Sequence, residues 1–299
     1  MNKYIVTTTI NKPNIAMHMY NQMDGWELIV AADKKTPCES FDGFDVLTPE
    51  YQESKWGKLS GLVGWNCIQR RNFAFLEALE RGAEVIATVD DDNYPLPNWG
   101  YGGGNVEACV YYDGCGVFDP LYPVDKNLWH RGFPVEYLEK RSCRYEIKEN
   151  KYDVLASLWL GDPDVDSVCR RDNMTTLITD RMFEYASDEI SPFNSQNTAL
   201  TREALKNYFM FPHVGRMDDI YGSYNLESMG YKVRYAEPTV YHIRTGHTIE
   251  NDYMAEEHGR RNLLPIVERI LEGKEWMDLI PMESRMAWDE YIRITGDFK

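Results

Sequence analysis

Val85-Ile86-Ala87-Thr88-Val89-Asp90-Asp91-Asp92-Asn93 is the stretch that decides the fold. Its first five residues are apolar or β-branched, a pattern typical of a buried central strand in a parallel sheet. Immediately before it, apolar residues recur at helical spacing over residues 66–81, and Gly82 stands where a helix C-cap belongs. We therefore expect a helix that leads into a central strand, with three aspartates at the carboxyl end of that strand.

Further strands and helices alternate on the N-terminal side of this stretch. Strands are predicted over residues 4–10, 26–32 and 44–47, with a helix over residues 11–23. Such alternation predicts an α/β fold, with a doubly wound, mostly parallel sheet flanked by helices. Ligands of these sheets bind beyond the carboxyl ends of the strands, where Asp33 and the three aspartates fall.

The rest of the chain carries weaker signals. Residues 93–126 are rich in Pro, Gly and Tyr and are expected to be irregular, whereas residues 255–273 predict an amphipathic helix. No linker or internal repeat divides the sequence, so we expect one compact domain over residues 1–299. It is predicted to have two functional halves, residues 1–125 and 126–254, and a C-terminal helical segment, residues 255–299.

Charge and hydropathy exclude several classes of partner. The formal net charge is −16, from 48 acidic and 32 basic residues, so the chain repels a nucleic-acid backbone. An anionic small molecule would need a metal ion or a cluster of arginines to offset this field. No apolar stretch approaches the roughly 18 residues of a membrane-spanning helix, and the N-terminus has no signal-peptide pattern. We expect a cytoplasmic protein without membrane insertion, and a homo-oligomer is left open.

The three adjacent aspartates are the strongest chemical signal. Like charges side by side raise one another's pKa and destabilise the fold unless a cation compensates them. A hard divalent ion such as Mn²⁺ or Mg²⁺ prefers the oxygen ligands that they offer. Side chains alternate along an extended backbone, so Asp92 is expected to contact the metal and Asp90 to share the metal or a ribose. The alternative is a solvated turn or a helix cap, where acidic residues are common.

Other residues are candidates for the same site. Arg70 or Arg71, on the predicted helix, can reach a diphosphate, and a solvated basic helix face is the alternative. His242 ends a β-type run and is expected as a further metal ligand, with His247 as a weaker candidate. A lone histidine is also common as a purely structural residue.

Two more groups are candidates by position. Asp218 and Asp219 precede an aromatic helix, where they either balance the helix dipole or act on a sugar as a base or as hydroxyl ligands. Thr8, Thr9 and Asp33, at the ends of the first two strands, are candidates for contacts to a base and a ribose.

Several of these motifs resemble known families. The segment from Trp65 to Asn72 and the Asp-Asp-Asp-Asn turn resemble the glycosyltransferase-like domain of the plant STELLO proteins and their bacterial relatives. The aspartate turn is also similar to that of the reversibly glycosylated polypeptides, which are UDP-arabinopyranose mutases. Further motifs of that family follow in the same order over most of residues 1–250, and they are Arg131-Gly132-Phe133-Pro134, Leu158-Trp159-Leu160, Asp162-Pro163-Asp164-Val165-Asp166, Gly215-Arg216-Met217-Asp218-Asp219 and Tyr241-His242.

The resemblance implies a GT-A fold of Rossmann-like type and a UDP-sugar held through Mn²⁺ or Mg²⁺. Residues 1–125 would bind the nucleotide-sugar, with Asp90 and Asp91 among the contacts, and residues 126–254 would bind the sugar or acceptor. It also implies that Arg131 becomes reversibly glycosylated while the sugar changes between pyranose and furanose. Such a role demands a nearby carboxylate, which Asp218, Asp219 or the acidic 162–166 loop can supply.

One departure weakens the mutase prediction. The family has a second arginine seven residues after the first, where this chain has Leu138. Three hypotheses follow. The first is a UDP-sugar mutase, an isomerase that acts through Arg131. The second is a metal-dependent glycosyltransferase that passes sugar to a separate glycan or small acceptor, with Arg131 as a diphosphate or carboxylate partner. The third is a non-catalytic nucleotide-sugar-binding protein, against which the intact aspartate turn argues.

Overall fold

The computed structural model describes residues 1–103, 105–112, 114–142, 144–179, 183–244, 246 and 248–298. Its N-terminal part alternates strands and helices, as the sequence predicts. The elements are β1 (Lys3–Thr9), α1 (Ile15–Asn21), β2 (Glu27–Ala32), β3 (Asp45–Leu47), α2 (Pro49–Val63), α3 (Arg71–Glu80) and β4 (Val85–Val89). The four strands are parallel in the order β3-β2-β1-β4, which confirms the predicted doubly wound arrangement.

Local capping explains where these helices begin. Asn14 accepts a hydrogen bond from the Met17 amide, so α1 starts later than residue 11. The helix predicted over residues 66–81 opens with a 3-10 turn, Ile68–Arg70, and continues as α3. α2 was not among the expected elements, although Thr48 caps it and Pro49 occupies its first turn.

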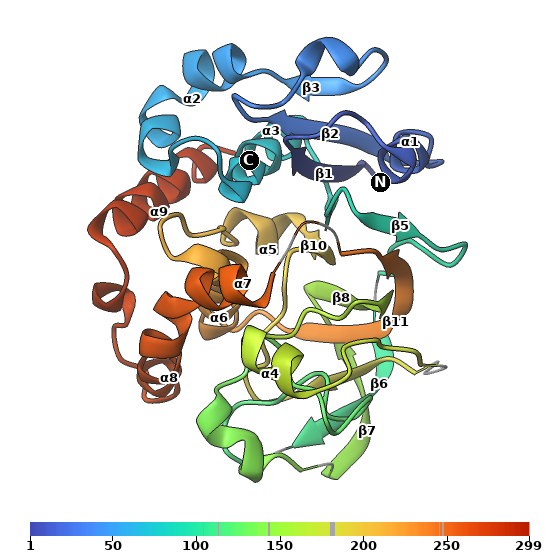
Figure 1. Cartoon of the computed structure of the whole chain (residues 1–299), viewed down its shortest axis with the longest axis vertical. Coiled ribbons are helices and arrows are strands. Elements are labelled where there is room, and N and C mark those ends of the chain that lie inside the picture. The colour runs from blue at the N-terminus through green and yellow to red at the C-terminus, as the bar shows by residue number, and fades with distance from the viewer. Residues whose placement is uncertain are drawn as a thin grey trace.

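The second half of the chain extends the same sheet. Its elements are β5 (Asn93–Pro95), β6 (Asn105–Tyr112), β7 (Arg144–Lys151), β8 (Val154–Gly161), α4 (Ser167–Asp172), β9 (Tyr185–Ser187), β10 (Asn197–Thr201), α5 (Arg202–Lys206), α6 (Asp218–Ser228) and β11 (Val233–His242). β10 is antiparallel to both β4 and β8 and joins the two halves, so the described strands form one mixed sheet in the order β3-β2-β1-β4-β10-β8-β11-β9-β6-β7, with β5 on β11. Figure 1 shows this sheet running from β3 at the top to β7 at the bottom.

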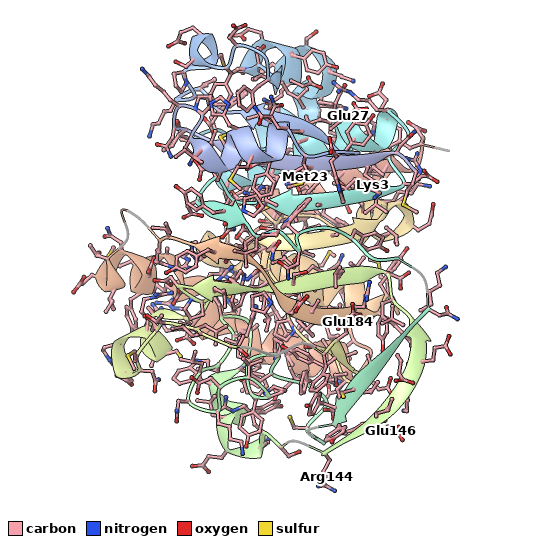
Figure 2. All side chains as sticks on the ribbon, turned by 90° about the vertical axis from the view of Figure 1, so that its right-hand side faces the viewer. Lys3, Met23, Glu27, Arg144, Glu146 and Glu184 are labelled. Carbon is pink, nitrogen blue, oxygen red and sulfur yellow. The ribbon has the colours of Figure 1, made fainter. Side chains whose placement is uncertain are left out.

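The structure corrects the expectation that residues 93–126 are irregular. β5 and β6 lie there, and their partners are β11, β7 and β9, which are distant in sequence. Because this pairing is non-local, the Gly- and Tyr-rich composition of the segment did not reveal it. Figure 2, turned by 90°, shows the two halves stacked, with Lys3 and Glu27 in the upper part and Arg144 and Glu146 in the lower part.

Three C-terminal helices, α7 (Ile249–Ala255), α8 (Glu257–Leu271) and α9 (Met282–Thr295), complete the fold. α8 agrees with the amphipathic helix predicted over residues 255–273, and it buries Leu263, Ile266, Val267 and Ile270. In Figure 1, α8 and α9 lie to the left of the sheet, beside α6 and α2 respectively. A second apolar cluster there includes Trp56, Phe209 and Trp288. Among the described residues, no helix is long and apolar enough to cross a membrane.

Candidate functional site

A polar cavity of about 290 Å³ lies at the carboxyl ends of β4 and β11. It contains the six residues that the sequence favours as metal ligands or catalytic groups, namely Asp90, Asp92, Arg131, Asp218, Asp219 and His242. The remaining lining residues are Ile68, Asp164, Ser195, Gln196, Gly215, Arg216 and Arg244. Residues between positions 68 and 244 of the sequence therefore meet in one place, at the edge where an α/β sheet binds ligands.

The three aspartates after β4 have different partners. Asp90 Oδ1 accepts a hydrogen bond from Arg71 Nη2 at 2.5 Å, and burial together with Asp92 raises the pKa of Asp90 despite this arginine. Asp91 points elsewhere, because its Oδ2 accepts from Thr9 Oγ1 at 2.5 Å and from Asn11 Nδ2 at 3.2 Å. Asp92 Oδ2 lies 3.3 Å from His242 Nε2. The alternation expected along this turn thus separates Asp91 from its two neighbours.

The side chains of Asp92 and His242 face each other in the polar cavity. His242 Nδ1 lies 2.5 Å from the carbonyl oxygen of Asp162, and only a protonated Nδ1 can donate to that acceptor. The lone pair of the neutral ring is then on Nε2, facing Asp92, which is the tautomer that a metal-binding histidine needs. Burial opposes protonation of His242, but the hydrogen bond to Asp92, the charges of Asp92 and Asp90 and the Asp162 carbonyl together raise the pKa of the imidazole.

The side chains around Asp92 offer a divalent metal only part of its ligands. The other oxygen of Asp92, Oδ1, is buried and has no hydrogen-bond partner among the described residues. Within the same part of the chain, no group of three or more His, Cys, Asp or Glu side chains is arranged to hold an ion alone. Mg²⁺ commonly binds through one or two carboxylates and takes its remaining ligands from substrate phosphates and water. Asp92 and His242 therefore fit an ion that arrives with a diphosphate.

Arg131 is buried in a cage of acceptors. Its Nε and Nη2 donate to the Asp164 carboxylate at 2.8–3.1 Å, Nη2 also lies 3.1 Å from Asp219 Oδ1, and Nη1 donates to the Arg216 carbonyl. Burial alone would lower the pKa of Arg131, but Asp164 and Asp219 raise it well above its usual value. For Asp164 the effects are reversed, because burial alone would raise its pKa but the Arg131 guanidinium holds that pKa well below its usual range. Every guanidinium nitrogen is thus engaged.

Asp218 and Asp219 differ in how fully they are bonded. Asp219 Oδ2 accepts from the Ser195 amide at 2.9 Å and Oδ1 from the Ile220 amide, in addition to Arg131. Asp218 accepts only from Gln69 Nε2, at 2.9 Å, among the described side chains. Burial and the neighbouring Asp219 raise the pKa of Asp218 to about 7. A carboxylate poised near neutral pH in a cavity is the usual state of a general base.

The cavity is also lined by two arginines that were not among the candidate residues from the sequence, Arg216 and Arg244. Arg216 Nη1 pairs with Asp252 at 2.8 Å and with Glu256 at 3.2 Å, and Arg244 also pairs with Asp252. Burial and the nearby cations Arg216 and Arg170 lower the pKa of Arg244. Both guanidinium groups are therefore already paired with carboxylates, and a bound diphosphate would share them with Asp252 and Glu256.

The structure corrects the role expected of Arg70. Its side chain is 0% exposed, and its nitrogens donate to Gln52 Oε1, Ser60 Oγ and the Gly64 carbonyl. The guanidinium carbon lies 3.5 Å from the centre of the Trp65 ring. Arg70 therefore contributes to the core behind the site, and its neighbour Arg71 is the arginine that reaches the aspartate turn.

Thr8, Thr9 and Asp33 lie at the same edge of the sheet but outside this cavity. The Asp33 carboxylate accepts from the amides of Lys34, Asn66 and Cys67, and Thr8 Oγ1 donates to the Ala31 carbonyl. Asp33 therefore holds the backbone of residues 66–67 at the end of β2, Thr8 bonds across to β2, and Thr9 bonds to Asp91. His247 lies outside the described residues.

No family model matches the chain, and no curated protein sequence matches it. Solved structures resemble it distantly. Glucosyl-3-phosphoglycerate synthase from Mycobacterium tuberculosis, in complex with phosphoglyceric acid, is 12% identical, with a TM-score of 0.44 over 92% of this chain and 81% of that one. A mannosyltransferase from Pyrobaculum calidifontis, in complex with GDP-Man and Mn²⁺, is 13% identical, with a TM-score of 0.39 over 98% and 69%. Protein A197 from STIV is 11% identical, with a TM-score of 0.40 over 82% and 86%. At these values the function must be argued from the residues of the site.

Proposed function

We propose that this chain is a metal-dependent nucleotide-sugar enzyme of GT-A type that transfers a sugar from a nucleoside diphosphate to a separate acceptor. The observation that carries the proposal is the Asp92–His242 pair, which is oriented by the Asp162 carbonyl and lies in one cavity with Arg216 and Arg244. When bound there, Mn²⁺ or Mg²⁺ would act as a Lewis acid for the diphosphate leaving group.

The protein's own residues supply the other functions. Arg216 and Arg244 would pair with the diphosphate. Asp218 would take the proton of the acceptor hydroxyl as that oxygen bonds to the anomeric carbon and the carbon–diphosphate bond breaks. Asp219 and Asp164 would hold Arg131 beside the reacting groups. Each of these groups lines the same cavity.

A conventional transfer fits Arg131 better than nucleophilic attack by its side chain. A guanidinium nitrogen must lose a proton before it can attack, and here the pKa of Arg131 is raised by two carboxylates. All three nitrogens are also committed as donors. This arrangement supports a positioning and electrostatic role for Arg131.

A UDP-sugar mutase acting through Arg131 is the second candidate. One observation favours it, because Arg131 lines the metal-site cavity and two carboxylates that can accept its proton lie within 3.1 Å. A glycosyl mass on Arg131 in peptide mass spectra, after incubation with UDP-sugars and Mn²⁺, would favour the mutase over the transferase.

The test of the proposed function is NMR of UDP- and GDP-sugars incubated with the protein and Mn²⁺. We expect metal-dependent release of the nucleoside diphosphate, slow without acceptor because water must replace it, and no furanose signals. Ring interconversion would identify the mutase instead. Unchanged spectra for every donor, with no nucleotide binding by calorimetry, would contradict both.

A further inference from the structure

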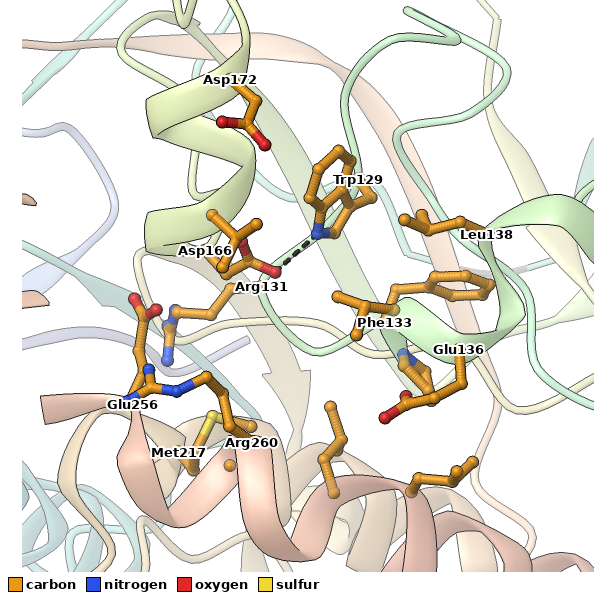
Figure 3. A pocket seen from close by; sticks show the side chains of 16 residues that line it. Trp129, Arg131, Phe133, Glu136, Leu138, Asp166, Asp172, Met217, Glu256 and Arg260 are labelled. Atoms are coloured by element: carbon orange, nitrogen blue, oxygen red, sulfur yellow. Dashed lines mark hydrogen bonds between the residues drawn. The ribbon is translucent and has the colours of Figure 1, made fainter. Parts of the chain in front are cut away.

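A second, larger cavity of about 450 Å³ lies beside the polar one. Its walls are the 129–138 segment, the α4 region and helix α8, and most of its lining side chains are apolar, including Trp129, Phe133, Val135, Leu138, Met217, Leu263 and Leu264. Figure 3 shows Trp129 and Phe133 on one side of this space and Met217 and Arg260 on the other. Its volume falls in the range of about 300–1,000 Å³ that is typical of small-molecule sites.

The two cavities meet at the catalytic groups. Arg131 lines both of them, and the consecutive residues Met217 and Asp218 line the apolar and the polar cavity respectively. The indole nitrogen of Trp129 donates to Asp166 Oδ2 at 2.5 Å, which fixes the aromatic wall next to Arg131 (Figure 3). A ligand in the apolar cavity therefore has one end at the wall formed by Arg131 and Met217, the residue next to the proposed base Asp218.

The charges around this cavity select the kind of ligand. Four carboxylate residues line it, Glu136, Asp166, Asp172 and Glu256, against two arginines, Arg131 and Arg260. Arg131 is already compensated by Asp164 and Asp219, so it offers no net positive charge. Glu256 is likewise compensated by Arg216, and Asp172 by Arg171. The lining then retains Glu136 and Asp166 against Arg260, so it is net negative and would repel a phosphate or carboxylate ligand.

We propose that the apolar cavity binds the sugar acceptor, and that this acceptor is an uncharged or cationic hydroxyl compound with an aryl or alkyl body. The assignment rests on the proposed transferase function. The apolar body would occupy the space between Trp129 and Leu264, and the hydroxyl would face Arg131 and Asp218. In the reaction, the hydroxyl oxygen bonds to the anomeric carbon, the diphosphate leaves with the electron pair, and the proton passes to Asp218.

Two fluorescent probes that share one aryl frame test the cavity and its charge. N-phenyl-1-naphthylamine is neutral, and 8-anilinonaphthalene-1-sulfonate is its anionic counterpart. We expect the full-length protein to bind the neutral probe at least about tenfold more tightly than the sulfonate. Leu264→Trp, which fills the cavity, should weaken the neutral probe at least about tenfold. Leu271→Trp is the matched control, since Leu271 is on the same helix, is 40% exposed and lines neither cavity.

Catalysis and nucleotide binding provide separate readouts. With a donor that the wild-type protein hydrolyses, transfer to 1-naphthalenemethanol should appear by mass spectrometry and should fall in Leu264→Trp, while UDP binding in the presence of Mn²⁺ stays unchanged. Equal probe binding by the two tryptophan variants, or preference for the sulfonate, would overturn the acceptor assignment. Absence of nucleotide binding in the wild-type protein would overturn the proposed function instead.

Discussion

The two halves of the sheet contribute to the polar cavity in different ways. In the parallel half, β1, β2 and β4 end in polar side chains that are mostly bonded to nearby loops, as Asp33 and Asp91 are. Only Asp90, Asp92 and Ile68 from this half line the cavity. The mixed half supplies the other ten lining residues, and they include the proposed base and all three arginines.

The polar cavity is therefore formed where the parallel half and the mixed half of the sheet meet. The proposed metal pair takes Asp92 from the loop after β4 and His242 from the end of β11, and Arg71 reaches across to Ser195 at 3.1–3.2 Å. Neither half holds a complete set of groups. Predictions that remove a group from one half at a time therefore separate the contribution of each.

The largest effect is expected from the metal ligand of the mixed half. His242→Ala should lower metal-dependent turnover by about a hundredfold or more, because even the partners that orient metal ligands cost 10–100-fold when they are removed. Turnover would be measured as nucleotide release against Mn²⁺ concentration. His18→Ala is the control, since His18 is exposed on α1 and lines neither cavity. A His242→Ala enzyme with an unaltered Mn²⁺ dependence would remove this residue from the site.

A smaller but substantial loss is expected from the proposed base. Asp218→Asn keeps the shape and the Gln69 contact but cannot accept a proton, so turnover should fall roughly 10²–10⁴-fold. The pKa of Asp218 is raised to about 7, and a base works only when deprotonated. Wild-type turnover should therefore rise with pH through about 7 and level off above it. Persistence of this rise in the asparagine variant would show that another group titrates.

The smallest effect on nucleotide binding is expected from Arg70 in the parallel half. Arg70→Met leaves the Gln52 oxygen and the Gly64 carbonyl without their buried donor, so the free energy of unfolding in urea should fall by about 3 kcal/mol. UDP affinity of the folded variant should equal that of the wild type. A loss of UDP affinity without a loss of stability would show that Arg70 binds the diphosphate.

The sequence predicted the parallel half well because its signals are local. β1, β2 and β4 are short apolar runs, and Asp90–Asp92 follow one of them directly. The sequence did not show which of the adjacent arginines, Arg70 or Arg71, faces the aspartate turn. Arg70 lies in the core because it contacts Trp65 and Gln52 there. Arg244 follows the end of β11 by two residues, so it was identifiable only after His242 had been placed.

The acidic 162–166 loop illustrates the same limit. The sequence offers this loop, Asp218 or Asp219 as the source of a carboxylate for Arg131, and in the structure Asp164 of the loop and Asp219 both pair with Arg131. The choice among Asp162, Asp164 and Asp166 depends on which side chain meets an arginine from a segment more than thirty residues away. Asp162 instead pairs with Arg170, and Asp166 accepts from Trp129.

Calorimetric titration of UDP, with and without Mn²⁺, tests the central claim most directly when wild-type protein, Asp92→Asn and Asp91→Asn are compared. Asp91 is the matched control, because it is adjacent but bonded to Thr9 and Asn11, away from His242. We predict Mn²⁺-dependent UDP binding in the wild type and in Asp91→Asn, and loss of that dependence in Asp92→Asn. Equal Mn²⁺-dependent affinity in all three proteins would contradict a metal site built on Asp92.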